Sequence, residues 1–427
     1  MLMRLALGVS VAVLGLAAVA AAQQGSTAKD PVRVKSDAIH AKVLTLDTHV
    51  DIRGGGDYGV LTPGQKCDLV KMQQGGVKGV FLAAYVGQRP AFDAAAYKAA
   101  FDAASRQFDF LDTLTGKARP EMCAFAASPS EVERVAKTGK RVIMTGLENG
   151  YPVGEDLANV KAFFDRGARY ITLTHSGHNQ IGDSSSDRNP PRHNGLSPFG
   201  KQVVAEMNRL GMMVDVSHSA TTTFWDAIKL SKAPIIASHS GCKALHDVDR
   251  NLDDEQLKAL AKNGGVVQIV ALASYLKPDS PGRAEAVRQL REELGMPPGG
   301  RGRQGGPPSQ PLTPEQQADA QKRRAVYMER MQAIDAKFPS ASVADFVNHI
   351  DHAVKVAGID HVGIGTDFDG GGGFPGFNDH SEAANVTEEL VRRGYSEQDI
   401  AKIWGGNLMR VWREVQKAAE REQTAAR

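Results

Sequence analysis

Strand-like apolar stretches recur eight times along the chain, and each is followed by sequence with the spacing of an amphipathic helix. The stretches cover residues 45–51, 79–86, 141–150, 169–176, 212–219, 234–240, 264–271 and 361–370. Strands that are apolar nearly throughout are typical of parallel sheets, because helices cover both of their faces. Eight such units in regular alternation predict an α/β fold of the (β/α)8 or TIM barrel type, rather than an open, doubly wound sheet.

The segments outside this repeat indicate how the chain is organised. Residues 1–22 carry Arg4 ahead of an apolar run and end in an Ala-x-Ala site, which predicts a cleaved signal peptide. The apolar run is shorter than the ~20 residues of a membrane span, so an uncleaved anchor is the less favoured alternative. A polar linker is expected at 23–36 and a single catalytic barrel at 37–420. We therefore expect an exported protein, periplasmic or secreted, with no stable membrane span.

One segment interrupts the alternation of strands and helices. Residues 277–317 contain two Pro-Pro pairs and the run GGRGRQGG, which cannot pack a core. We interpret 277–317 as a mobile surface insertion between the seventh strand and the helix that precedes the eighth.

Composition narrows the class of partner. Lys and Arg total 51 against 49 Asp and Glu, so no basic field points to nucleic acid, and a small-molecule substrate is expected instead. Cys67, Cys123 and Cys242 are an odd number of cysteines, and their spacings match no metal motif. At most one disulfide can form within the chain, so the cysteines are either core residues or one bridge with a spare thiol.

Side chains that can bind a metal lie at the ends of six strands. The first strand carries His49 and Asp51, whose two-residue spacing places both side chains on one face. The others are Glu148, His175, His218, His239 and Asp367, one on each of five further strands. The carboxyl ends of the strands form the active face of such a barrel, so we expect these groups to meet there.

This set of imidazoles and carboxylates favours a divalent metal site. The absence of thiolate ligands argues against a closed structural zinc site, and zinc, manganese and cobalt all accept such ligands. More ligands are present than one tetrahedral ion needs, which indicates two ions that share a carboxylate. For any single histidine taken alone, a hydrogen-bonded structural role is the alternative.

The motifs HxD, GxE(N)G, LTH, DxSH, SHS and GxGxDFDG follow one another in this order. Together they resemble the membrane dipeptidase, or renal dipeptidase, family of zinc peptidases, often called M19. The resemblance runs from about residue 38 to 415. It implies a (β/α)8 barrel of the metal-dependent hydrolase type, which agrees with the pattern of strands and helices.

The resemblance also implies a role for each of the site residues. His49 and Asp51 would hold one Zn²⁺, His218 and His239 a second, and Glu148 would bridge the two ions. Asp367 matches the family's catalytic aspartate, His175 its substrate-side histidine, and Arg250 the arginine that grips the substrate carboxylate. The implied reaction is hydrolysis of a dipeptide, with a D-residue accepted at the C-terminal position, by a metal-bridging hydroxide. The implied assembly is a homodimer.

Several alternatives stay open at this point. The same metal site could serve an amidohydrolase acting on another small amide or a lactone, such as an N-acyl amino acid. A non-catalytic metal-binding or solute-binding barrel would be expected to lack Glu148 or Asp367. Arg250 could instead be a surface residue capping the helix that begins near Asp253, and Asp369 could either support the site or bond its own loop.

Overall fold

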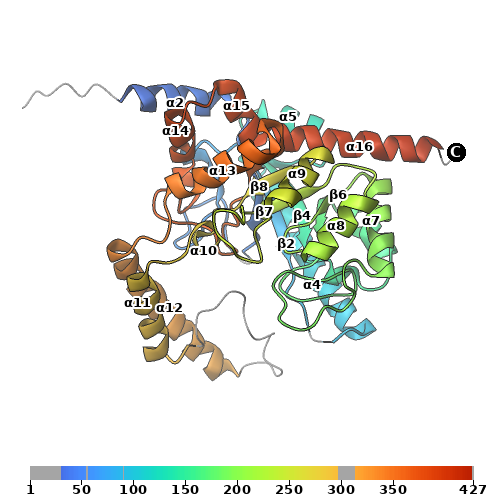
Figure 1. Cartoon of the computed structure of the whole chain (residues 1–427), viewed down its shortest axis with the longest axis horizontal. Helices are drawn as coiled ribbons and strands as arrows, with labels where there is room; N and C mark the ends of the chain where they lie inside the picture. Colours follow the sequence, from blue (N-terminus) through green and yellow to red (C-terminus); the bar gives the residue numbers. More distant parts are fainter. Residues whose placement is uncertain (1–29, 54–55, 90, 297–312, 426–427) are drawn as a thin grey trace, which may run out of the picture.

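A parallel sheet curls around the centre of the protein, and helices cover its outside (Figure 1). This computed structural model describes residues 30–53, 56–89, 91–296 and 313–425, so the predicted signal peptide lies outside the described residues. The strands are β1 (Leu46–Asp51), β2 (Gly79–Tyr85), β3 (Cys123–Phe125), β4 (Arg141–Glu148), β5 (Ala168–Thr172), β6 (Met213–Asp215), β7 (Ile236–Ser240), β8 (Val266–Ile269) and β9 (Val362–Ile364). Their order in the sheet is β1-β2-β4-β5-β6-β7-β8-β9, with parallel pairing throughout.

The first and last strands of this order meet and nearly close the barrel. Val50 forms a parallel bridge with Phe368 just beyond β9. The backbone N–H of Asp51 donates to the carbonyl of Phe368 at 2.9 Å, and that of Asp367 donates to the carbonyl of His49 at 2.9 Å. The prediction of a (β/α)8 barrel is therefore confirmed.

Each predicted strand contains an observed one, but β3 was not predicted. It has only three residues, of which Cys123 alone is fully buried. It pairs with β4 outside the circular order. A strand this short carries no apolar run in the sequence, which is why the pattern of strands did not reveal it.

The helices of the barrel alternate with the strands. They are α3 (Leu69–Gln74), α4 (Ala94–Thr113), α5 (Pro129–Ala136), α6 (Ala158–Asp165), α7 (Pro198–Leu210), α8 (Thr221–Leu230), α9 (Asp254–Lys262), α13 (Val343–Ala357), α14 (Ala384–Arg392), α15 (Glu397–Ala401) and α16 (Asn407–Ala425). Helix α16 packs against one end of the barrel, where its Trp412 contacts Phe81 and Phe81 contacts Tyr170. These buried side chains form an apolar floor beneath the polar strand ends.

Two boundaries differ from the sequence prediction. Of the polar linker expected at 23–36, residues 31–36 belong to helix α2 (Pro31–Lys42), and residues 23–29 lie outside the described part of the chain. The Asp30 side chain accepts a hydrogen bond from the Val32 N–H, and proline suits the first helical position. The α2 helix then docks on α14 through an ion pair of 2.9 Å between Arg33 and Glu388.

The insertion expected at 277–317 follows β8 and precedes α13. Its residues 297–312 lie outside the described part of the chain, and the described residues are partly helical. After the short α10 (Ala273–Leu276) come α11 (Pro281–Glu293) and α12 (Pro314–Lys337). Figure 1 shows α11 and α12 side by side and apart from the barrel. Arg283 of α11 pairs with Asp335 of α12 at 2.5 Å. Among the described residues, no helix combines the length and the apolar character that crossing a membrane requires.

Candidate metal centre and active site

The carboxylate of Glu148, at the end of β4, lies at the centre of the predicted site. Four imidazole Nε2 atoms surround it, at 3.2 Å for His218, 3.5 Å for His49 and His239, and 3.6 Å for His175. The four histidines come from the ends of β1, β5, β6 and β7. The barrel therefore brings them together at the carboxyl ends of its strands, as expected.

The two remaining predicted carboxylates, Asp51 and Asp367, border the same cluster. Asp51 Oδ1 lies 3.6 Å from His49 Nε2. Three groups each place one ligand atom per residue within 4.8 Å of the others. They are His49, Asp51 and Glu148; Glu148, His175 and His218; and His49, His239 and Asp367. His175 is thus about as close to Glu148 as His239 is, which agrees with the expectation that these groups meet at the strand ends.

The donor atoms fit a cation better than they fit one another. His49 Nε2 and Asp51 Oδ1 are buried without a hydrogen-bond partner. Buried polar atoms in native proteins are nearly always paired, so these two require a partner of another kind. Imidazole and carboxylate donors converging on one space are the ligands that divalent zinc, manganese or cobalt would use.

Hydrogen bonds from outside the cluster orient two of the histidine rings. The Tyr170 hydroxyl lies 3.0 Å from His49 Nδ1, and the Ser238 hydroxyl lies 2.9 Å from His239 Nδ1. Ser238 also donates to the buried carboxylate of Asp215 at 2.6 Å. With Nδ1 engaged, Nε2 of each ring faces Glu148, which is how partners of ligating histidines commonly act. The sequence analysis did not identify Tyr170, Ser238 or Asp215.

Burial keeps three of the imidazoles neutral. It lowers the pKa of His218 and of His239 well below the ordinary value, and the positive charge of Arg250 adds to this. It also lowers the pKa of His175 to about 3. Neutral imidazole is the form that coordinates a metal, so these rings are in the state that binding requires.

The carboxyl groups show the opposite effect. Burial raises the pKa of Glu148 to about 7. Burial, with the charge of Asp51 added, raises the pKa of Asp367 well above its ordinary value. For His49, burial lowers the pKa, but Glu148 and Asp51 outweigh it and raise the pKa well above its ordinary value. Carboxyl groups are thus crowded in a buried space, where a divalent cation would supply the compensating charge.

Four residues next to these strand ends have left-handed backbone angles that favour glycine. They are Asn149 (φ 76°), His218 (φ 65°), Asp367 (φ 59°) and Asp369 (φ 65°). Non-glycine residues in this conformation are uncommon and gather at functional sites. Here the turn lets the side chains of His218 and Asp367 leave the strand direction and reach the cluster.

Arg250 is a buried residue and not a surface helix cap. Its side chain is 6% exposed, its Nη2 donates to the His239 carbonyl at 3.1 Å, and its guanidinium lies 5.4 Å from the Tyr275 ring. Helix α9 is capped by Asp253 itself, through a capping box with Gln256. The alternative of a helix-capping role for Arg250 is therefore excluded.

Asp369 bonds its own surroundings. Its carboxylate accepts hydrogen bonds from the backbone N–H groups of Lys66 at 2.9 Å and Cys67 at 3.0 Å, and it lies 3.4 Å from Arg53. Of the two roles considered for Asp369, the structure favours hydrogen bonding within the loops.

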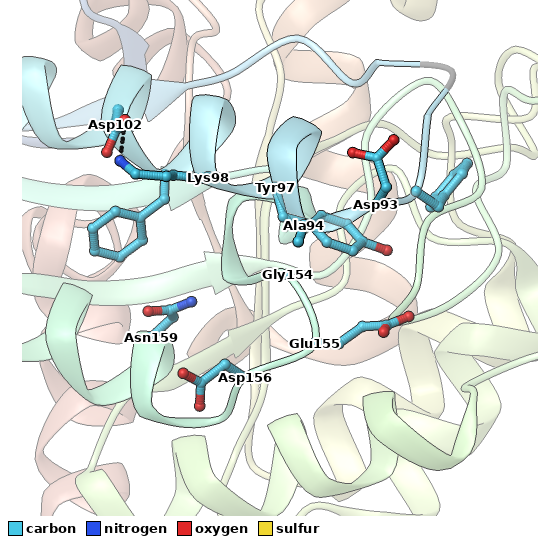
Figure 2. A pocket seen from close by; sticks show the side chains of 11 residues that line it. Asp93, Ala94, Tyr97, Lys98, Asp102, Gly154, Glu155, Asp156 and Asn159 are labelled. Atoms are coloured by element: carbon cyan, nitrogen blue, oxygen red, sulfur yellow. Dashed lines mark hydrogen bonds and ion pairs between the residues drawn. The ribbon is translucent and has the colours of Figure 1, made fainter.

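A pocket of about 460 Å³ lies away from the cluster, between α4 and the segment before α6 (Figure 2). Its carboxylates are engaged or exposed: Asp93 caps α4, and Asp102 pairs with Lys98 at 2.7 Å. No histidine lines this pocket. A second pocket, of about 190 Å³, adjoins the cluster and is lined by both His218 and Arg250. The smaller pocket is therefore the one next to the metal ligands.

Comparison with known proteins agrees with this geometry. The model of the membrane dipeptidase family, peptidase family M19, matches residues 34–426. The chain belongs to the membrane dipeptidase family. As a member of the M19 family it is a metallo-dipeptidase, and the resemblance drawn from its motifs is confirmed.

Known relatives align with most of this chain. Dipeptidase tcpJ of Claviceps purpurea is 30% identical over 357 residues, which are 82% of this chain and 70% of the relative. The structure of the probable dipeptidase PvdM from Pseudomonas aeruginosa is 34% identical, with a TM-score of 0.76 over 91% of this chain and 99% of that one. The structure of a metallo peptidase from Rhodobacter sphaeroides was solved with a phosphinate mimic of the dipeptide L-Ala-D-Ala. It is 22% identical, with a TM-score of 0.66 over 87% of this chain and 99% of that one. At this level of identity the similarity supports the fold alone.

Proposed function

We propose that this dipeptidase binds two zinc ions and that Glu148 bridges them. The observation that carries the proposal is that the two carboxylate oxygens of Glu148 face different histidines. Oε2 faces His49 at 3.5 Å, whereas Oε1 faces His218 at 3.2 Å and His239 at 3.5 Å. One ion would then be held by His49, Asp51 and Glu148, and the other by Glu148, His218 and His239.

The chemistry divides between the metal centre and the protein side chains. Bound zinc would lower the pKa of a coordinated water from ~15.7 toward ~7 and so supply hydroxide as the nucleophile at neutral pH. Asp367 accepts the proton of the nucleophile and returns it to the leaving amine. His175, whose Nδ1 lies 2.9 Å from the Ser176 hydroxyl, donates a hydrogen bond from Nε2 to the developing oxyanion.

Arg250 binds the free carboxylate of the C-terminal residue. Its planar guanidinium offers paired donors that match a carboxylate, and its Nε has no partner within the protein. The Tyr275 ring lies 5.4 Å from the guanidinium, within reach of a cation–π contact. A dipeptide, with either an L- or a D-residue at the C-terminal position, presents a carboxylate to Arg250 and its scissile amide to the metal centre. An N-acyl amino acid can present the same two groups, so the substrate panel includes one.

The test is release of free amino acids from L-L and L-D dipeptides by the metal-depleted protein, before and after zinc is restored. A tripeptide and an N-acyl amino acid accompany the dipeptides. We expect only dipeptides to be cleaved, and only with metal present. Cleavage of the N-acyl amino acid in preference to dipeptides would support the amidohydrolase alternative. A zinc-loaded protein that cleaves no dipeptide would contradict the proposal.

We also propose that the protein acts after export and as a homodimer. Arg4, the apolar run and the Ala-x-Ala site before Gln23 support the export step. N-terminal sequencing of protein from the producing cell is expected to begin at Gln23. Light scattering of the purified protein is expected to give twice the chain mass, and a monomer mass would exclude the dimer.

A further inference from the structure

The pocket of about 190 Å³ beside the metal ligands is built by three segments that follow β5, β6 and β7. Its lining includes Ser185, His218, Ser219, Arg250 and Asn251. Backbone bonds join the segments after β5 and β6. The Ser185 N–H donates to the His218 carbonyl at 2.8 Å, and Ser184 and Ser219 form an antiparallel β-bridge. The wall of the pocket is therefore preformed.

Several polar atoms of the lining residues have no hydrogen-bond partner. They are Ser185 Oγ, Ser219 Oγ, His218 Nδ1, Arg250 Nε and Asn251 Oδ1, all of them buried. Such atoms are rare in native proteins, and the residues that carry these line one cavity. A serine hydroxyl can turn about its side-chain bond toward a partner that enters the cavity. The set mixes donors and acceptors, so it suits a group that can both donate and accept.

Charged side chains at the rim already have partners. Lys243 lies 3.5 Å from Asp247, and Asp249 lies 3.3 Å from Arg188. Arg250 is the remaining charge in the pocket, and the proposed function assigns it to the substrate's carboxylate. The rest of the pocket therefore matches a neutral polar group rather than a second ion.

We propose that this pocket selects the side chain of the substrate's C-terminal residue and prefers one that carries a hydroxyl or a carboxamide, such as serine, threonine or asparagine. This inference rests on the proposed dipeptidase function, because it requires the C-terminal carboxylate at Arg250. The residue that bears that carboxylate places its side chain beside the guanidinium. Ser185 and Ser219 are the specificity-determining residues.

The pocket has room for such a side chain. Its 190 Å³ corresponds to roughly six water volumes at ~30 Å³ each. A site that bonds a substrate hydroxyl or amide discriminates against the analogue without it, because the site's buried polar groups are then left unpaired. We expect kcat/KM to be at least ~10-fold higher for the polar member of a matched pair.

The experiment compares Ala-Ser with Ala-Ala and Ala-Asn with Ala-Leu, each with an L- or a D-residue at the C-terminal position, using the full zinc-loaded protein. The ratio of kcat/KM within each pair is the readout, so changes in total activity cancel. In Ser185→Ala and Ser219→Ala the ratio is expected to fall toward one. Ser130→Ala, an exposed serine at the start of α5, is the matched control and keeps the wild-type ratio.

The outcomes separate this inference from the proposed function. Equal kcat/KM values within both pairs, with dipeptides still cleaved, would overturn the pocket assignment but not the dipeptidase function. The pocket would then hold water instead of the substrate's side chain. A preference for leucine, or for aspartate or lysine in an extended panel, would overturn it as well. If the wild-type protein cleaves no dipeptide, both proposals fall together. A serine variant that retains the full preference would remove that serine from the specificity-determining pair.

Discussion

Glu148 is almost completely buried, and its described ion-pair partners are all imidazoles. Three of those rings are held neutral by burial, so they offer little positive charge to the carboxylate. A buried anion without a full countercharge is costly for folding. The position of Glu148 is therefore explained best by a bound cation that supplies the missing charge.

Replacement of Glu148 by glutamine is expected to remove the bridge while keeping the side-chain volume. We expect the metal content to fall from two ions to one or fewer per chain, and kcat to fall by at least ~10²–10³. Elemental analysis after dialysis and dipeptide kinetics are the measurements. Glu155→Gln, at an exposed carboxylate beside the other pocket, is the control. Two tightly held ions in Glu148→Gln would refute the bridge.

Replacement of Arg250 by lysine preserves the charge but removes the planar fork. We expect KM for a dipeptide to rise by ~10-fold or more with a smaller change in kcat, because a charge-assisted hydrogen bond contributes ~1.5–3 kcal/mol. For a dipeptide amide, which lacks the carboxylate, the KM values of wild type and variant should differ far less. Arg188→Lys at the pocket rim is the matched control. An unchanged KM for the free dipeptide would exclude the carboxylate role.

The sequence revealed the side chains that gather around Glu148 but not the residues that orient them. His49 and Asp51 could be found because polar residues stand out at the end of an apolar strand. Tyr170 and Ser238 could not, because each lies within a strand and reads as an ordinary strand residue. Their function depends on which ring lies opposite, and that is settled only by the curvature of the closed barrel.

Among the elements, β1 and β9 are joined by a buried polar network as well as by backbone bonds. The Asp47 carboxylate of β1 accepts hydrogen bonds from the Thr366 hydroxyl at 2.6 Å and N–H at 2.9 Å, and it lies 2.8 Å from His380 Nε2. The network connects the first strand with the segment after the last one. It therefore fixes the closure of the barrel.

Asp47→Ala should destabilise the fold strongly, because it leaves buried donors unpaired. We expect the free energy of unfolding to fall by ~3–5 kcal/mol, the usual cost of removing one partner of a buried pair. Urea unfolding of the zinc-free protein is the measurement. The comparison is Asp102→Ala, which breaks an exposed pair with Lys98 and should cost no more than ~1 kcal/mol. Equal costs would show that the network does not secure the closure.

The eight barrel strands could be located from the sequence because each is an apolar run followed by a helical pattern. Their limits could not, because residues such as His175 and His218 lie beyond the last ladder bond of β5 and β6. The helices of the insertion were missed for a related reason: proline and glycine dominate 277–317, yet residues 281–293 carry a regular helix capped by Ser280.

Over the whole molecule, the three cysteines are free and buried, so none of them forms a disulfide. Of the two interpretations left open by the sequence, that of core residues is the correct one. Burial raises the pKa of Cys123 and of Cys242 to about 12, and it raises the pKa of Cys67 well above the ordinary value. The reactive thiolate is therefore disfavoured at all three positions.

A thiol-specific reagent at pH 8 is expected to modify none of the cysteines in the folded protein and all three after denaturation. The raised pKa values keep the groups protonated well above neutral pH, and burial excludes the reagent. Ser130→Cys, which places a thiol on the surface, is the positive control and should react at once. Rapid labelling of the native wild-type protein would show that part of the core opens.

The closure of the barrel also has a consequence for the chain during its own synthesis. The backbone bond from Asp367 to His49 joins residues near the two ends of the barrel sequence. A chain still emerging from the ribosome already carries His49 and Asp51, but it lacks the last strand and the aspartate that follows it. We therefore expect peptide-cleaving capacity to appear only once the barrel sequence is nearly complete, and a truncated translation product to be inert rather than partly active.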